Sequence, residues 1–285
     1  MSEEKKTLDL KSFHYLENGR VLYSNLNTIK CTKILDPGVY NLKNSGYPKY
    51  ENELTLAEMV ESIKIHEFPD KERIDTLLTK FIDPEIKEKV KSAGFLHKTG
   101  VLLYGKEGTG KSTILKYFFS KYVAQNNALA IYINEHEQIG KVWDFVIALR
   151  QTHNNPIFII FEEIDSLFKE KHHESTLKSI LDGNLSIDNC IFFATTNYIN
   201  DIPSALKDRP SRFKYNFEIE GIQEKQDIIR IIKNILKEDY SQEEIEEFSN
   251  GLTGSTIDTI KQFCLDKIMN VKSISKNKKN IGFGK

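Results

Sequence analysis

One stretch indicates the fold of this chain: Gly105-Lys-Glu-Gly-Thr-Gly-Lys-Ser112, which fits the phosphate-binding loop pattern GxxxxGK[ST] without a gap. The run before it, 101–104, is apolar and strand-like, and the run from 112 to about 122 carries apolar side chains at helical spacing. The pattern requires this order of strand, glycine loop and helix, because converging backbone N–H groups and a helix N-terminus together bind phosphate. A glycine-rich turn that matches by chance is the alternative, and the correct flanks argue against it. The stretch therefore predicts an α/β domain that binds a nucleoside triphosphate.

Each residue type in this loop suits the binding of a nucleotide with Mg²⁺. The lysine, Lys111, is expected to reach the β- and γ-phosphates, and the Ser112 hydroxyl is expected to ligate Mg²⁺. The residues predicted to hold ATP in this segment are Gly105, Gly108, Thr109, Gly110, Lys111, Ser112 and Thr113.

Composition narrows the class of protein. The 285 residues are 39% hydrophobic and 28% charged with a net charge of −1, which is typical of a globular chain and argues against a nucleic-acid partner. Three scattered cysteines, Cys31, Cys190 and Cys264, lack metal-ligand spacing and indicate a reducing compartment. The longest apolar runs are too short to span a bilayer, and the first residues have no apolar signal region. We therefore expect a cytoplasmic protein that does not contact a membrane.

The pattern of apolar residues divides the chain into four parts. Residues 1–60 are strand-like, and Asn18-Gly19 between apolar runs predicts a hairpin. They indicate a small β-rich module that contacts a client or packs on the rest of the protein. Residues 61–220 alternate helical and strand-like patterns, which predicts a mostly parallel sheet. Residues 221–271 are helical, and 272–285 form a basic tail, either solvated and flexible or partner-binding.

A second group of candidate residues follows the buried strand predicted at 157–161. The acidic run 162–165 comes directly after it, and the carboxyl end of a strand is where an open α/β sheet keeps its chemistry. Glu163 is placed to polarise the water that attacks the γ-phosphate, and Glu162 to hold Mg²⁺. Asp165 is as well suited to capping the next helix.

Three further polar residues are candidates with weaker signals. Asn197 follows another buried strand and is placed to bind the attacking water or the γ-phosphate, although an asparagine there is more often a turn residue. Arg209 and Arg212 flank a proline, and guanidinium groups can stabilise a transferring phosphoryl group from a neighbouring subunit. Isolated surface arginine pairs usually have no function.

Taken together and in order, five segments resemble the AAA subgroup of the AAA+ ATPases. They are 100–112 for Walker A, 162–165 for Walker B, 194–197 for the sensor 1 strand, 205–213 for the arginine-finger segment and 251–255 for the adenine side of the lid. The resemblance covers roughly residues 66–270.

The resemblance implies a P-loop AAA+ parallel sheet with a helical lid, assembled into a homo-oligomeric ring, usually a hexamer, with ATP between subunits. Arg209 and Arg212 would then complete the neighbour's site, and Gly254 and Ser255 would lie beside the adenine. Three departures from the family pattern matter: Lys106-Glu107 replaces a pair of prolines, Glu162 replaces an aspartate, and Ile139 stands where a pore aromatic is expected.

Three functions remain open at this stage. The leading hypothesis is an ATP-hydrolysing ring that remodels or disassembles a protein client. The second is a nucleotide-gated structural or assembly ring with little turnover, which Glu162 and Ile139 favour. The third is a nucleic-acid-directed ATPase of the helicase-loader kind, which only the lysine-rich tail supports.

Overall fold

The computed structural model describes residues 13–15, 20–24, 31–32, 35, 37–43, 50–58, 68, 70–133, 139–169, 171–236 and 240–269. By its contacts the chain divides into two compact units, Met1–Ile219 and Glu220–Lys285. The tail predicted at 272–285 and the end of the first predicted part, at residue 60, lie outside the described residues. Within the described ranges, none of the helices combines the length and the apolar character needed to cross a bilayer.

A ten-stranded sheet with the order β10-β6-β9-β8-β7-β4-β5-β2-β1-β3 runs through the first unit. Its strands are β1 Phe13–Tyr15, β2 Arg20–Ser24, β3 Cys31–Thr32, β4 Gly38–Lys43, β5 Tyr50–Glu58, β6 Lys98–Tyr104, β7 Leu129–Ile133, β8 Ile157–Phe161, β9 Cys190–Thr196 and β10 Tyr215–Glu218. The strands from β10 to β4 are parallel, and those from β5 to β3 pair antiparallel. The parallel α/β sheet predicted from the sequence is therefore confirmed.

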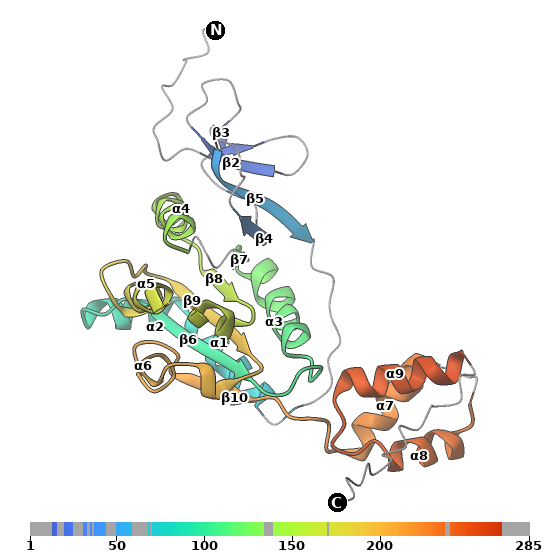
Figure 1. The fold of residues 1–285 in the computed structure, drawn as a ribbon. Helices are drawn as coiled ribbons and strands as arrows, with labels where there is room; N and C mark the ends of the chain where they lie inside the picture. The colour runs from blue at the N-terminus through green and yellow to red at the C-terminus, as the bar shows by residue number, and fades with distance from the viewer. Residues whose placement is uncertain are drawn as a thin grey trace, which may run out of the picture. The chain divides into compact units, whose positions relative to one another are not determined.

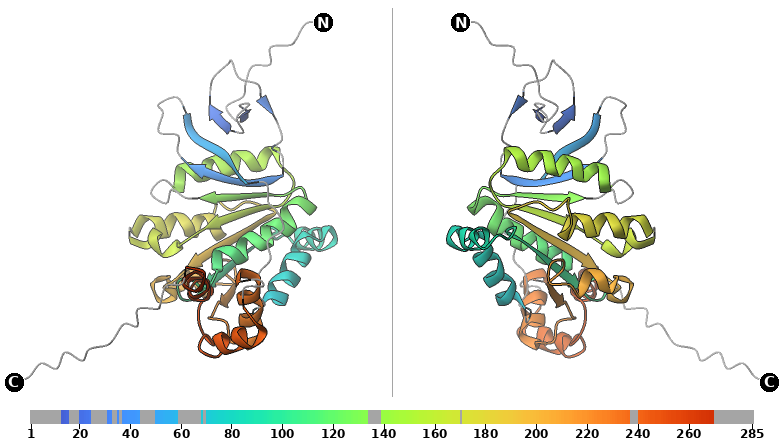
Figure 2. Two further views of the ribbon diagram at one scale, coloured as in Figure 1. Left: turned by 90° about the vertical axis from the view of Figure 1, so that its right-hand side faces the viewer. Right: turned by 90° about the vertical axis from the view of Figure 1, so that its left-hand side faces the viewer.

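Helices cover both faces of the parallel strands (Figures 1 and 2). They are α1 Lys71–Ile82, α2 Pro84–Ser92, α3 Lys111–Gln125, α4 Ile139–Thr152, α5 Lys171–Asp182 and α6 Ser204–Lys207, with short 3₁₀ turns η2 Ile164–Lys169 and η3 Ile199–Asp201. Side chains of α1 and α3 pack in one buried cluster and those of α4 and α5 in another, because successive residues of the strands point to opposite faces. Both faces are thus covered, as long apolar strands require.

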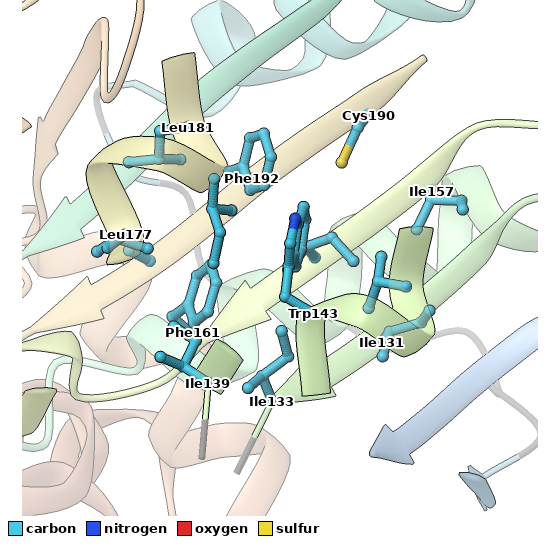
Figure 3. Packing of buried hydrophobic residues seen from close by; sticks show 14 of the residues in the cluster. Ile131, Ile133, Ile139, Trp143, Ile157, Phe161, Leu177, Leu181, Cys190 and Phe192 are labelled. Carbon is cyan, nitrogen blue, oxygen red and sulfur yellow. The ribbon is translucent and has the colours of Figure 1, made fainter. Parts of the chain in front are cut away.

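The aromatic side chains of one face show how tightly the core is filled. Trp143 of α4 lies over Phe192 of β9 with ring centroids 5.8 Å apart (Figure 3). Its Nε1 donates to the carbonyl oxygen of Leu185 at 2.8 Å, so the buried indole keeps a hydrogen-bond partner. The helix α3, predicted from about 112 to 122, buries its whole predicted apolar face: Ile114, Leu115, Phe118, Phe119 and Tyr122.

The N-terminal strands differ from the separate module expected from the sequence. β4 pairs parallel with β7, in the register Gly38↔Leu129 to Leu42↔Ile133, so the sheet continues from one part into the other. Val39 belongs to one buried cluster and Leu42 to the opposite one, which is the two-sided burial of an interior parallel strand. The edge of β7 would otherwise present unpaired backbone groups, and β4 satisfies them. The hairpin predicted around Asn18-Gly19 is present as the antiparallel pair β1 and β2, although its turn lies outside the described residues.

The second unit is helical, with α7 Lys225–Leu236, α8 Gln242–Asn250 and α9 Ile257–Ile268 around their own apolar cluster. Ser241 and Glu244 form a capping box at the start of α8. The N-cap of α9 is Thr256, whose hydroxyl accepts the backbone N–H of Thr259.

Candidate nucleotide site

The glycine loop connects β6 to α3 in a path that side chains would block. Gly105 has a φ of 143°, and a Cβ there would lie 2.2 Å from the carbonyl oxygen of Ile219. Gly110 is the N-cap of α3 with a φ of 90°, in the left-handed region that favours glycine. The Thr109 hydroxyl donates to the carbonyl oxygen of Lys106 at 2.9 Å and closes the loop on itself. The N-terminus of a 15-residue helix therefore opens directly onto the loop.

Lys111 joins the loop to the end of β9. Its side chain is buried, and Nζ donates to the carbonyl oxygens of Gly105 at 2.8 Å and Lys106 at 2.9 Å. The same nitrogen donates to Asn197 Oδ1 at 2.7 Å, across 86 residues of sequence. Two residues predicted from separate motifs are thus in direct contact.

Nearby carboxylates act on the charge of the buried Lys111 side chain. Burial lowers the pKa of Lys111 below its ordinary value, and the carboxylates of Glu107, Glu163 and Asp165 partly oppose that shift. The acidic residues after β8 therefore act electrostatically on the loop lysine.

The acidic turn after β8 is tied to the end of β9 by two hydroxyl groups. Glu163 is exposed, with a φ of 49°, and its backbone N–H donates to Thr195 Oγ1 at 3.0 Å. Thr196 Oγ1 donates to Asp165 Oδ1 at 2.6 Å. Asp165 lies inside η2 and accepts this bond, so it acts as a tether rather than as the helix cap considered from the sequence.

Glu162 has the free acceptor that a cation would use. Its Oε1 is buried and has no hydrogen-bond partner among the described residues. A buried carboxylate oxygen is costly to leave unpaired, so the residue fits a Mg²⁺ ligand. No group of three or more His, Cys, Asp or Glu able to hold a metal occurs in the described ranges, and Mg²⁺ held with phosphates and water needs fewer protein ligands. Ser112, exposed in the first turn of α3, fits as the second protein ligand.

Residues 101–220 match the model of the ATPase family associated with various cellular activities, AAA. This part of the chain is similar to the AAA family. The enzyme class predicted from the sequence, an ATPase, is the class of this family.

The chain is also similar to several named proteins. The chain is 28% identical over 198 residues to the cell division cycle protein 48 homolog of Archaeoglobus fulgidus, covering 62% of this chain and 26% of the relative. It is 28% identical over 211 residues to the vesicular-fusion protein SEC18 of Candida albicans, covering 63% and 26%. It is 30% identical over 172 residues to the ATPase family gene 2 protein of Schizosaccharomyces pombe, covering 55% and 20%. The match therefore spans about a quarter of these relatives' own length.

The two arginines predicted to act as arginine fingers, Arg209 and Arg212, have opposite environments. Arg209 is exposed, and its guanidinium group has no hydrogen-bond partner among the described residues. Arg212 is buried, and it donates to Asp182 through Nε at 2.9 Å and Nη2 at 3.1 Å. Its Nη1 donates to the carbonyl oxygen of Ala205, so all three nitrogens have partners within the chain. The expectation that both arginines reach a neighbouring subunit therefore does not fit Arg212.

The remaining predicted AAA positions are placed as follows. Gly254 and Ser255 lie in the second unit, where Ser255 forms a bridge with Ile222 and Gly254 has a φ of 77°. Their position beside adenine stays a prediction. Ile139 begins α4 and is buried, so it is part of the core rather than of a pore surface.

Sequence reasoning missed Thr195, Thr196 and Asp182 as residues that support the site. In the sequence the threonines stand out only as the polar end of an apolar strand, and Asp182 only within 181–183, a sixth and weaker likeness to the family pattern. Their roles depend on contacts with residues about 30 positions away, which a local pattern does not report.

Proposed function

We propose that this chain hydrolyses ATP to ADP and phosphate as a subunit of a homo-oligomeric ring, a hexamer, and thereby remodels or disassembles a protein client. The contact between Lys111 Nζ and Asn197 Oδ1, at 2.7 Å, carries the proposal, because it brings the phosphate loop and the end of β9 to one point. The AAA family match supports the ATPase step. The client, held through the N-terminal strands, and the cytoplasmic location are part of the proposal.

The residues of the site divide the chemistry between them. Lys111 exchanges its carbonyl acceptors for β- and γ-phosphate oxygens when ATP binds. Ser112 and Glu162 would hold Mg²⁺, which would neutralise charge on the phosphate oxygens. Asn197 orients the attacking water, and the Glu163 carboxylate takes its proton as the new P–O bond forms and the bond to ADP breaks.

Arg209 completes the site of a neighbouring subunit. Its exposure supports this role, whereas Arg212 supports the shape of the segment through Asp182. Arg209→Ala subunits mixed with Glu163→Gln subunits should regain some turnover, because a working site then forms at mixed interfaces. No rescue at any mixing ratio, with assembly intact, would count against an arginine supplied in trans.

The test of the proposed function is Mg²⁺-ATPase turnover per subunit across a wide range of protein concentration. Turnover should rise steeply and then reach a plateau, because sites are completed between subunits. Glu163→Gln should lose about 100-fold or more of the turnover while keeping ATP binding. Glu85→Gln, which changes an exposed acid on α2, is the matched control and should behave as wild type.

One observation favours a second function, a nucleotide-gated structural or assembly ring. Ile139 is buried, so the segment where the family has a pore aromatic does not present this side chain to a threaded polypeptide. Negligible turnover at every concentration, with ATP binding and assembly retained, would favour this function. Salt-sensitive DNA binding would favour the helicase-loader function instead.

A further inference from the structure

We propose that Thr195 is a positioning residue for ATP hydrolysis: its hydroxyl holds the backbone of Glu163 in the conformation that presents the carboxylate. The inference rests on the proposed role of Glu163 as the base. Thr195 itself touches neither ATP nor the reacting water in this proposal. It acts only through the turn that follows β8.

Thr195 lies just beyond the point where the hydrogen-bond ladder between β8 and β9 ends. The last pair between β8 and β9 joins Phe161 to Ala194, whereas β9 continues to Thr196. Glu162 and Glu163 leave the sheet at this point, and their backbone groups have no strand partner on that side. The Thr195 hydroxyl takes the place of the missing ladder bond by accepting the Glu163 N–H at 3.0 Å. Thr195 is buried, so water does not readily substitute for it.

The backbone of Glu163 needs such a support. Its φ of 49° lies in the left-handed region, where the Cβ of a residue other than glycine comes too close to a backbone carbonyl oxygen. The other non-glycine residues with positive φ in the described part of the chain are Asn127 and Asn189, and asparagine tolerates this region. A strained residue persists only where its surroundings hold it, and such strain gathers at functional sites. Here the strained residue is the acid that the sequence assigns to the chemistry.

A second hydroxyl holds the other side of the turn. Thr196 Oγ1 donates to Asp165 Oδ1 at 2.6 Å and accepts the backbone N–H of Tyr198 at 2.9 Å. Within the turn, the N–H of Ser166 donates to the carbonyl oxygen of Glu163 at 2.9 Å. The Thr195 bond is therefore the contact that reaches the Glu163 N–H directly from the neighbouring strand.

The experiment compares Thr195→Val, which keeps the shape but removes the acceptor, with Thr195→Ser, which keeps the hydroxyl. Thr195→Val should lower kcat about 10- to 100-fold, because a small displacement of a catalytic group has an effect of that size. ATP affinity, measured with a fluorescent ATP analogue, should change less than about threefold, since the phosphate loop is untouched. Thr195→Ser should stay within about threefold of wild type in both quantities.

The controls separate this inference from the proposed function. Thr195→Val should add nothing in a Glu163→Gln background, because the group that it positions is already absent. Wild-type turnover in Glu163→Gln would defeat the assignment of Glu163 itself. Inactive Glu163→Gln with fully active Thr195→Val would overturn only the positioning role. A serine variant as impaired as valine, or a valine variant that loses ATP binding or fails to fold, would also overturn it, because each indicates a purely structural threonine.

Discussion

The phosphate loop and the β4 edge are both built around parallel strands, but different interactions stabilise them. We use the term β4 edge for the side of β4 that pairs with β7, together with Leu35, Leu42 and His153. In the loop, Lys111 and Asn197 meet through short polar contacts that serve phosphate chemistry. At the β4 edge, Leu42 is fully buried and the backbone N–H of Leu35 donates to His153 Nε2 across 118 residues. The loop has a motif that can be recognised in eight residues, whereas the β4 edge has none. The comparison predicts that changes in the loop affect chemistry and changes at the β4 edge affect stability.

The largest effect is expected from Lys111→Met. The variant keeps a chain of similar length but loses the charge that binds the phosphates, so turnover should fall at least about 100-fold and ATP binding should be lost. The melting temperature should change little if the loop serves chemistry rather than folding. Lys116→Met, at an exposed position of the same helix, is the matched control and should be active. A large fall in melting temperature for Lys111→Met would contradict the claim that the loop serves chemistry rather than stability.

Leu42→Ala tests the other side of the comparison. Removing a fully buried leucine from the core should lower the free energy of unfolding by about 2–5 kcal/mol, and Leu42→Val should lower it less. Denaturant unfolding measures both values. Turnover per folded molecule should stay near wild type. If the strands before residue 60 fold as an independent module, unfolding of the nucleotide domain will not respond to either variant.

Arg209 and Arg212 show the same contrast between chemistry and stability within a single segment. Burial alone would raise the pKa of Asp182, but hydrogen bonds from Arg212 and Ser211 outweigh it and hold the pKa below its ordinary value. Arg212→Ala leaves that carboxylate without its main partner and should destabilise the chain by about 2 kcal/mol or more. Arg209→Ala should leave thermal stability unchanged and lower turnover only. Equal melting temperatures for the two variants would contradict the division of roles.

The smallest effect is expected from pH at the β4 edge. Burial lowers the pKa of His153 below its ordinary value of 6.5, so the unfolded chain binds more protons as the solution becomes acidic. The stability contributed by neutral His153 is present above about pH 6.5 and is lost as the pH falls. Protonation also removes the acceptor for the Leu35 N–H, a bond of about 1 kcal/mol.

Melting temperatures at pH 7.5 and 5.5 check this prediction. The fall on acidification should be smaller in His153→Gln, whose amide can accept the same bond without titrating. Burial also lowers the pKa of His97, but this residue is present in both proteins, so the difference between them reports His153. An identical pH dependence would show that His153 does not support the β4 edge.

Much of the parallel sheet could be predicted because its strands are nearly continuous apolar runs. The predicted strand at 101–104 lies within β6, and the one at 157–161 coincides with β8. β10, in contrast, has a short and partly exposed sequence, and its pairing with β6 makes it a strand. β4 looked like part of a separate hairpin module, because no local pattern reports which strand edge a short apolar run will pair with.

The sequence alone was enough to locate the phosphate loop, the acidic turn and Asn197, because each consists of a few residues that follow a recognisable strand. Folding added what depends on residues far apart in the chain. It separated an exposed Arg209 from a buried Arg212, and it placed the Thr195 hydroxyl on the strained backbone of Glu163. The physical reason is that burial, hydrogen-bond partners and backbone strain are properties of the whole packed structure, whereas a motif records only neighbours in sequence.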